Sequence, residues 1–208
     1  MSLEIWLAYV VTVAVLLVIP GPTILTVIGY SLAHGRRANL ALVAGVALGD
    51  STALALSLLG LGALLAASAW WFTAVKTVGG LYLVWLGWRM LRAGVGPAEV
   101  ALPAAPDSLW RLFANTWLVT ALNPKGIVFF VAFLPQFITP GSAVAPQMWL
   151  LAVTFVVMAI INAALYARFA AAAHRFLASA RARRGFNIGG GSLLAGAGVW
   201  ALLARRPG

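Results

Sequence analysis

The stretch Ile5–Tyr30 reads IWLAYVVTVAVLLVIPGPTILTVIGY, an apolar run that is interrupted by Pro-Gly-Pro at residues 20–22. A helix needs about 20 consecutive apolar residues to cross a bilayer, and this run is long enough. Proline removes one backbone hydrogen bond, and its ring clashes with the preceding turn, so the helix must break or kink there. The stretch therefore predicts a membrane-spanning helix that is broken within its apolar part.

The composition of the whole chain also indicates a lipid environment. Of the 208 residues, 63% are hydrophobic and only 9% are charged, whereas a soluble domain has about 25% charged residues. The apolar runs are continuous and do not alternate, which favours helices over a barrel. We expect an all-α integral membrane protein with about six transmembrane helices, at Ile5–Tyr30, Leu40–Ala67, Trp70–Leu91, Leu112–Ile138, Met148–Ala167 and Ile188–Ala204.

The proline-containing segment Gly94–Asp107 separates the first three spans from the last three. We expect a first half at 1–93, a polar linker at 94–110 and a second half at 111–208 within a single membrane domain. An odd number of spans per half places the two halves in opposite orientations, as in an inverted repeat. The fourth span carries a second break, Asn123-Pro124-Lys125-Gly126, so helices one and four are both broken by proline.

The net charge of +10 is concentrated in alternate loops. The positive-inside rule places the basic loops in the cytoplasm and both termini in the periplasm, and no nucleic-acid-binding module is needed to explain the charge. The basic residues of the expected cytoplasmic side are Arg36, Arg37, Arg89, Arg92, Arg111, Arg168, Arg175, Arg181, Arg183 and Arg184. The stretch Arg168–Arg184 is interpreted either as an amphipathic helix on the anionic inner leaflet or as a solvated extension of the fifth span.

Matched breaks in two halves point to a binding site near the middle of the membrane. Asn123 is a suitable N-cap for the helix that resumes at Pro124, and Thr23 is a candidate for the same role after the first break. Two helix N-termini would present N–H groups and positive dipole ends to a carboxylate. A mechanical kink is the alternative for each break. The candidate substrate-binding residues are Pro20, Gly21, Pro22, Thr23, Asn123, Pro124, Lys125 and Gly126.

Asp50 is the carboxylate that falls inside a predicted span. An acid there costs a few kcal/mol and is a functional candidate. It is expected to receive a substrate ammonium group or a coupling proton, and a structural pair with a lysine is the alternative. Lys125 is the natural partner and Lys76 the second choice. The secondary site candidates are Lys76, Gln136 and Asn162.

Several activities are not expected of this sequence. With a single intramembrane acid, two histidines and no cysteine, neither a dedicated metal site nor a cofactor is expected. The chain has no phosphate-binding loop for ATP hydrolysis and no nucleophile–base pair, so an enzyme is not expected. The glycines, among them Gly45 and Gly49, are interpreted as sites of close helix packing.

An ordered set of short motifs resembles the lysine-exporter and homoserine–threonine-exporter (LysE/RhtB) family over nearly the whole chain. The motifs are Pro20-Gly21-Pro22, His34-Gly35-Arg36-Arg37, Gly45 with Leu48-Gly49-Asp50, Lys76, Gly79-Gly80-Leu81-Tyr82-Leu83, Leu86-Gly87, Asn123-Pro124-Lys125, Phe129-Phe130, Phe133-Leu134-Pro135-Gln136-Phe137 and the glycine-rich last span. The resemblance implies a multi-pass exporter of amino acids or close derivatives in the bacterial inner membrane, driven by the proton gradient.

Other function classes stay open at this stage. A non-transporting membrane scaffold would use the breaks as kinks and Asp50 as a structural pair, and a passive channel or exporter for small solutes or cations would need no amino-acid site. The expected partners are an amino-acid substrate and membrane lipid, without nucleic acid, and a homo-oligomer is left open.

Overall fold

The computed structural model describes residues 1–67, 69–92, 108–139 and 141–203. Within these ranges every regular element is a helix and no strand occurs, which confirms the predicted all-helical class. The elements are α1 (Leu3–Val18), α2 (Pro22–His34), the 3₁₀ turn η1 (Gly35–Ala38), α3 (Asn39–Ala67), α4 (Ala69–Arg92), α5 (Leu109–Ala121), α6 (Pro124–Val128), the π-helical turn η2 (Phe129–Phe133), the 3₁₀ turn η3 (Leu134–Phe137), α7 (Val144–Arg168), α8 (Ala170–Ala178) and α9 (Ala180–Leu203).

Both predicted helix breaks are present. The first lies between α1 and α2, where Ile19 and Gly21 have extended backbone conformations. The second lies between α5 and α6, whose axes, followed through to Phe137, differ in direction by 40°. Each new helix has proline in its first turn, where the missing N–H has no partner to lose. Both breaks are therefore produced by local sequence.

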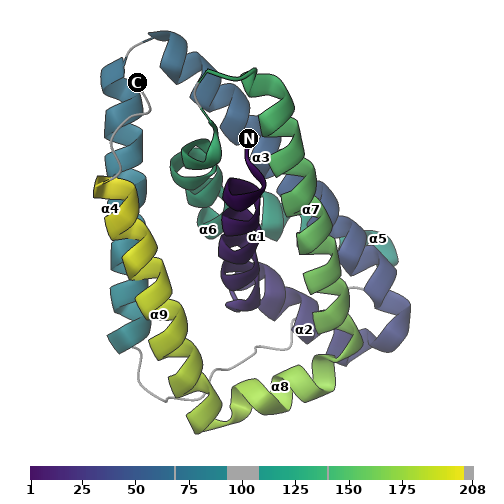
Figure 1. Ribbon diagram of the computed structural model, residues 1–208. Helices are drawn as coiled ribbons and strands as arrows, with labels where there is room; N and C mark the ends of the chain where they lie inside the picture. Colours follow the sequence, from purple (N-terminus) through teal and green to yellow (C-terminus); the bar gives the residue numbers. More distant parts are fainter. Residues whose placement is uncertain (68, 93–107, 140, 204–208) are drawn as a thin grey trace.

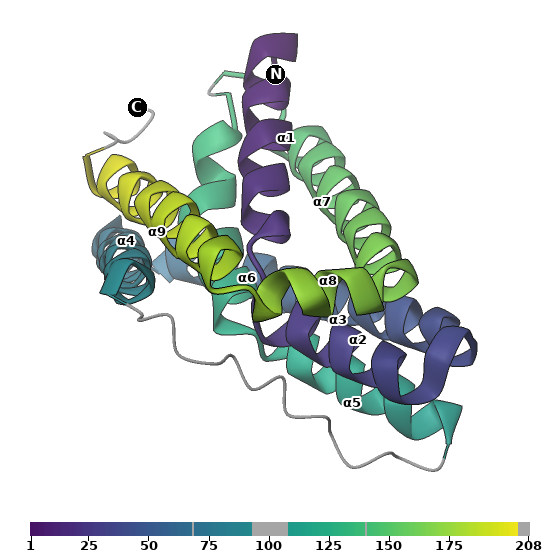
Figure 2. The same cartoon turned by 90° about the horizontal axis from the view of Figure 1, so that it is seen from below.

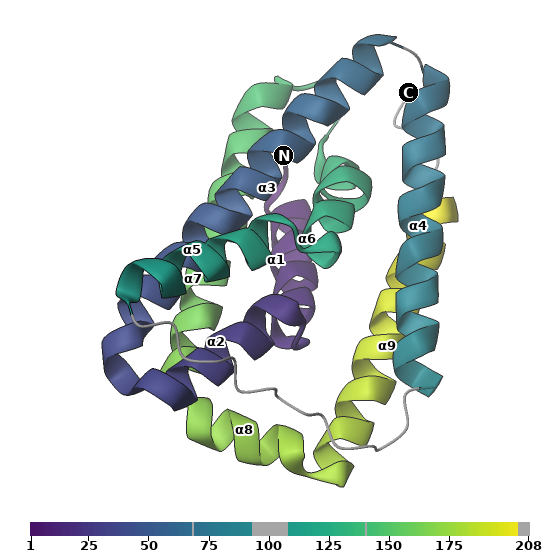
Figure 3. The ribbon, with the colours of Figure 1, turned by 180° about the vertical axis from the view of Figure 1, so that it is seen from behind.

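The helices pack so that each half contacts the other (Figures 1 and 3). Helix α5 packs along α3, and α1 packs along α7, so each half's long second helix contacts the opposite half's broken span. Helix α4 pairs with α9. An inverted repeat would produce this reciprocal packing. The division at 94–110 stays a prediction, because most of that linker lies outside the described residues.

Two stretches of the described chain are long and apolar enough to cross a membrane, Pro22–Gly60 and Val144–Arg168. The bent pair of α5 with α6–η3 makes a third if it counts as one span. Helix α1 is apolar but has only 16 residues. Helices α4 and α9 have 24 residues each, about 36 Å at 1.5 Å per residue, which exceeds the hydrocarbon core. The six-span count stays a prediction.

The end of the chain differs from expectation in two places. Helix α9 begins at Ala180 rather than near Ile188, because the arginines that interrupt the apolar run belong to its first turns. Helix α8 follows a break at Phe169 and turns across the base of the molecule beside α2 (Figures 1 and 2). It is therefore not an extension of α7. Residues Ile24 and Ile28 of α2 pack against Ala173 of α8.

Glycines bring helices into close contact, as the sequence predicted. A Cβ added to Gly87 of α4 would lie 2.5 Å from the carbonyl oxygen of Gly191 of α9. A Cβ on Gly49 of α3 would lie 2.5 Å from Cβ of Thr120 on α5. Backbones can approach this closely only where the side chains are very small. The contact on α3 sets the position of the next residue, Asp50.

Candidate functional site

The two helix breaks meet at a small cavity of about 30 Å³ in the interior. Its polar side chains and glycine backbones come from four helices and from the loops before α2 and α6, and the residues are Gly21, Thr23, Asp50, Asn123, Lys125, Gly126 and Asn162. Apolar neighbours such as Leu16, Val46 and Phe155 close the rest of the wall. The volume is close to the roughly 30 Å³ that one water occupies, so an amino acid can enter only if the helices move apart.

Lys125 compensates for the break in α1. Its Nζ donates to the carbonyl oxygens of Leu16 and Ile19, at 2.7 Å each. The Leu16 carbonyl has no helical partner because residue 20 is proline. The C-terminal end of a helix carries partial negative charge, which favours an ammonium group. A lysine of the second half thus stabilises the broken helix of the first.

Helix α7 supplies donors to the carbonyls of Leu17 and Val18, which lie between Leu16 and Ile19 in the sequence. Asn162 Nδ2 donates to the Leu17 carbonyl at 3.1 Å, and the Tyr166 hydroxyl donates to the Val18 carbonyl at 2.8 Å. The carbonyls of residues 16–19 are therefore all bonded by side chains of the second half. A helix end in hydrocarbon needs this, because no water is present to donate to the exposed carbonyl groups.

Asn123 connects the two breaks. Its Oδ1 accepts from the backbone N–H of Lys125 at 3.1 Å, so it is the predicted N-cap of α6. Its Nδ2 donates to Thr23 Oγ1 at 3.0 Å. The expectation that Thr23 caps α2 is wrong, because the N-cap is Gly21 and Thr23 already lies within the helix. The Thr23 hydroxyl instead accepts a hydrogen bond from Asn123 of the other half.

The two helix N-termini differ in their free N–H groups. In α6, the N–H groups of Gly126 and Ile127 both bond the Asn123 carbonyl at 3.1 Å. In α2, within the described residues, the backbone N–H groups of Thr23 and Ile24 donate no hydrogen bond. The sequence predicted two open N-termini. The structure leaves only that of α2 open toward the cavity.

Asp50 faces the same cavity from α3. It is buried, with 7% of its surface exposed. A Cβ added to Gly126 of α6 would lie 4.0 Å from the Asp50 Oδ1. Lys125 lines the same cavity from α6. Within the described residues no hydrogen bond or close ion pair joins them, because the ammonium is held at the end of α1. The alternative interpretation, a direct structural pair of Asp50 with this lysine, is therefore not formed among the described residues.

Comparisons with known proteins define the family. Residues 14–205 match the family described as LysE type translocator. The chain belongs to this family. The LysE translocator is 34% identical over 205 residues to a homoserine/homoserine lactone efflux protein of Salmonella typhimurium, covering 99% of both chains. It is 34% identical over 205 residues to an uncharacterized membrane protein of Vibrio cholerae, covering 99% of this chain and 100% of the other. It is 31% identical over 143 residues to a leucine efflux protein of Klebsiella pneumoniae, covering 66% and 68%. No solved structure matches the chain.

The family assignment confirms the resemblance, and it makes the protein a transporter rather than an enzyme. Most of the predicted site residues of this LysE translocator lie around the cavity. Pro20, Pro22 and Pro124 do not line it; they act by ending one helix and starting the next. Gln136 lies on η3, where its Nε2 donates to the Ala132 carbonyl at 2.8 Å, away from the cavity. The side chain of Lys76 lies outside the described residues.

Sequence reasoning missed Tyr166. The signal available was its spacing from Asn162, because residues four apart lie on the same face of a helix. A second missed feature is the buried ring cluster beside the cavity, in which Phe130 and Phe155 have ring centroids 4.7 Å apart. Phe130 stood out in the sequence only as part of the Phe129-Phe130 motif of the resemblance, and no sequence signal placed its ring against Phe155 beside the cavity.

Proposed function

We propose that this LysE translocator exports amino acids or close derivatives across the bacterial inner membrane by secondary active transport coupled to protons. The observation that carries the proposal is the meeting of the two helix breaks around separated charges of opposite sign, Lys125 and Asp50. The efflux names of the Salmonella and Klebsiella relatives support an amino-acid substrate. The family itself supports export.

The cavity chemistry suits a zwitterion. A carboxylate is attracted to the open N-terminus of α2 and to the Lys125 ammonium, because both present positive charge. An ammonium group is attracted to Asp50, which has no hydrogen-bond partner among the described residues. Asn123 and Thr23 lie between the two breaks and are suited to contact the polar part of the substrate. The side chain of the substrate is not specified by these groups.

Alternating access would require the bonds between the halves to break and reform. These are the bonds of Lys125, Asn162 and Tyr166 to α1 and of Asn123 to Thr23. Neutral hydrogen bonds contribute about 1 kcal/mol each, and bonds from a charged donor contribute about 1.5–3 kcal/mol. A substrate carboxylate that draws Lys125 away from α1 would offset part of this cost. Binding would thereby favour separation of the halves.

Asp50 is the proposed coupling residue. It is the buried acid of the described chain, and a proton on it would remove its attraction for an ammonium group. Proton binding and substrate release are then linked, as antiport requires. Acids in membrane spans commonly serve as proton relays for the same reason.

The test is homoserine transport in proteoliposomes with an imposed pH gradient. We expect uphill transport that collapses when an uncoupler is added. Asp50→Asn should abolish uphill transport and weaken homoserine binding, because the site loses both the proton carrier and the partner of the ammonium group. Normal uphill transport by Asp50→Asn would remove this residue from the mechanism. Downhill flux that is unchanged by the uncoupler would identify a channel, and no flux with any amino acid would favour a scaffold.

A further inference from the structure

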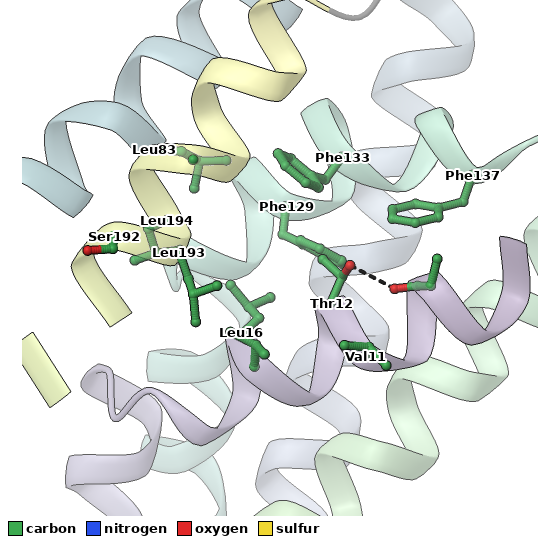
Figure 4. A pocket seen from close by; sticks show the side chains of 13 residues that line it. Val11, Thr12, Leu16, Leu83, Phe129, Phe133, Phe137, Ser192, Leu193 and Leu194 are labelled. Atoms are coloured by element: carbon green, nitrogen blue, oxygen red, sulfur yellow. Dashed lines mark hydrogen bonds between the residues drawn. The ribbon is translucent and has the colours of Figure 1, made fainter. Parts of the chain in front are cut away.

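Two adjoining apolar grooves run between α1 and α9. The first has a volume of about 450 Å³, and Figure 4 shows the side chains that line it, including Val11, Leu83 and Phe133. The second has a volume of about 540 Å³ and continues toward α8. Both are lined by Val15 and Leu193, so they form one continuous channel along the face of α1.

The lining of this channel suits hydrocarbon. The polar side chains that line it are Thr12 and Ser192, and the Thr12 hydroxyl already donates to the Ala8 carbonyl at 2.8 Å. A polar solute would lose its hydration here without gaining new hydrogen bonds. An apolar chain would fill the space at no such cost.

The length of the channel matches one leaflet of a bilayer. On α1 it extends from Ala8 to Ile19, which is about 16 Å at 1.5 Å per residue. A leaflet contributes about half of the roughly 30 Å hydrocarbon core. The channel is therefore long enough for an acyl chain that crosses one leaflet.

One end of the channel is basic. Its last lining residues are Phe176 of α8 and Ala182 and Gly185 of α9. The exposed residues Arg175, Arg181 and Arg184 directly adjoin these three in the chain. The acids of the described chain, Glu4 and Asp50, do not line either groove. Arginines can extend along apolar surface to reach a lipid phosphate, and anionic headgroups attract such clusters.

We propose that this channel binds one anionic phospholipid, with an acyl chain between α1 and α9 and the phosphate at Arg175 and Arg181. The charge at one end favours this occupant over a second copy of the chain, which carries a net charge of +10. The channel shares the wall residue Leu16 with the polar cavity but none of that cavity's polar residues, and the proposal does not depend on which substrate the protein exports. Its ligand class is a lipid with a net negative headgroup.

Lipid titration of the purified full-length chain in detergent tests the headgroup. Dioleoyl phosphatidylglycerol and dioleoyl phosphatidylcholine share the same acyl chains, and native mass spectrometry counts bound molecules. We expect one tight phosphatidylglycerol, bound about tenfold more tightly than phosphatidylcholine. Arg175→Gln with Arg181→Gln should remove this preference. The matched control, Arg36→Gln with Arg37→Gln, changes the same charge on η1 and should retain it. Equal binding of the two lipids, or equal loss in both double variants, would contradict the proposal.

A second pair of variants tests the groove. Gly189 and Gly196 line it, and a Cβ added at either position meets nothing within 4 Å. Gly189→Leu and Gly196→Leu should therefore fold and lower phosphatidylglycerol affinity at least about tenfold by occupying the channel. Gly60→Leu, an equally open position on α3, should bind normally. Undiminished lipid binding by both groove variants would overturn the proposal. So would a groove variant that changes only the oligomeric mass or only the preference among substrates, because the channel would then hold a second copy or a substrate side chain.

Discussion

Lys125 has contacts in the structure that differ from those the sequence suggested. Its position in a proline break suggested either a substrate contact or a partner for Asp50. The structure places its ammonium group on the carbonyl of Leu16, whose helical partner would be the proline at residue 20, and on the carbonyl of Ile19, the C-cap of α1. Lys125 thus stabilises the end of α1 in this conformation and also places a positive charge beside the cavity. The two roles are compatible only if the carbonyl contacts are exchangeable.

Replacing Lys125 tests this double role. Lys125→Met leaves two carbonyls unsatisfied, and we expect a stability loss of about 1–3 kcal/mol together with loss of homoserine transport. Lys125→Arg keeps the charge and the donors and should recover most of the stability. Thermal unfolding in detergent and proteoliposome transport are the two measurements. Unchanged melting of Lys125→Met would show that the carbonyl contacts contribute nothing.

The bond between Asn123 and Thr23 is the side-chain link between the two breaks. A double-mutant cycle with Asn123→Ala and Thr23→Val should give a coupling energy of about 0.5–1.5 kcal/mol. Asn123→Asp retains the cap of α6 but replaces the donor to Thr23 with an acceptor, so the link between the two residues should persist only through donation by the Thr23 hydroxyl. Strictly additive single variants would mean that the two breaks are energetically independent.

At the scale of elements, α4 and α9 form a pair held together by glycine contacts. Gly80 and Gly87 of α4 face Gly198 and Gly191 of α9, and each close contact involves backbone atoms of the other helix. Backbone atoms cannot move aside as a flexible side chain can. The spacing of these glycines predicted close packing, but the identity of the partner helix is a property of the assembled fold.

Gly87→Ala should weaken this pair. The new Cβ would lie 2.5 Å from the Gly191 carbonyl oxygen, and such overpacking costs about 1–3 kcal/mol. Gly189→Ala, on α9 with open space around it, is the matched control and should be neutral or slightly stabilising because alanine favours helix. The melting temperature should fall for Gly87→Ala and should not fall for Gly189→Ala. Equal values would show that α4 and α9 separate at no cost.

At the scale of the whole molecule, the arrangement is reciprocal between the halves. The beginning of α1 and the last turn of α9 lie toward the same end, and α8 lies at the opposite end (Figures 1 and 3). This agrees with the alternation of basic and uncharged loops. The positive-inside rule then predicts that the beginning of α1 and the last turn of α9 lie on the periplasmic side and the arginines near α8 on the cytoplasmic side.

Cysteine labelling tests this orientation on a background without natural cysteine. Ser2→Cys and Leu203→Cys, the latter 75% exposed, should react with an impermeant maleimide added outside intact spheroplasts. Arg37→Cys on η1 should react only after the membrane is opened. The reverse pattern would invert the assigned topology. Labelling of Ser2→Cys and Leu203→Cys from opposite sides would contradict an even number of spans.

The sequence by itself determined that the protein lies in lipid, that it is helical and where both helices break. These follow from composition and from proline, whose effect reaches only the neighbouring turn. It also located most of the cavity residues, because a break in a span exposes polar backbone that functional side chains can use.

Only the tertiary structure decided which side chain satisfies which backbone group. Lys125 lies 109 residues from Leu16 in the sequence, and Tyr166 lies 148 residues from Val18. A carbonyl freed by proline in hydrocarbon must find a donor, but any donor of suitable reach would meet that requirement. The choice depends on which helices pack together, and so does the separation of Asp50 from Lys125.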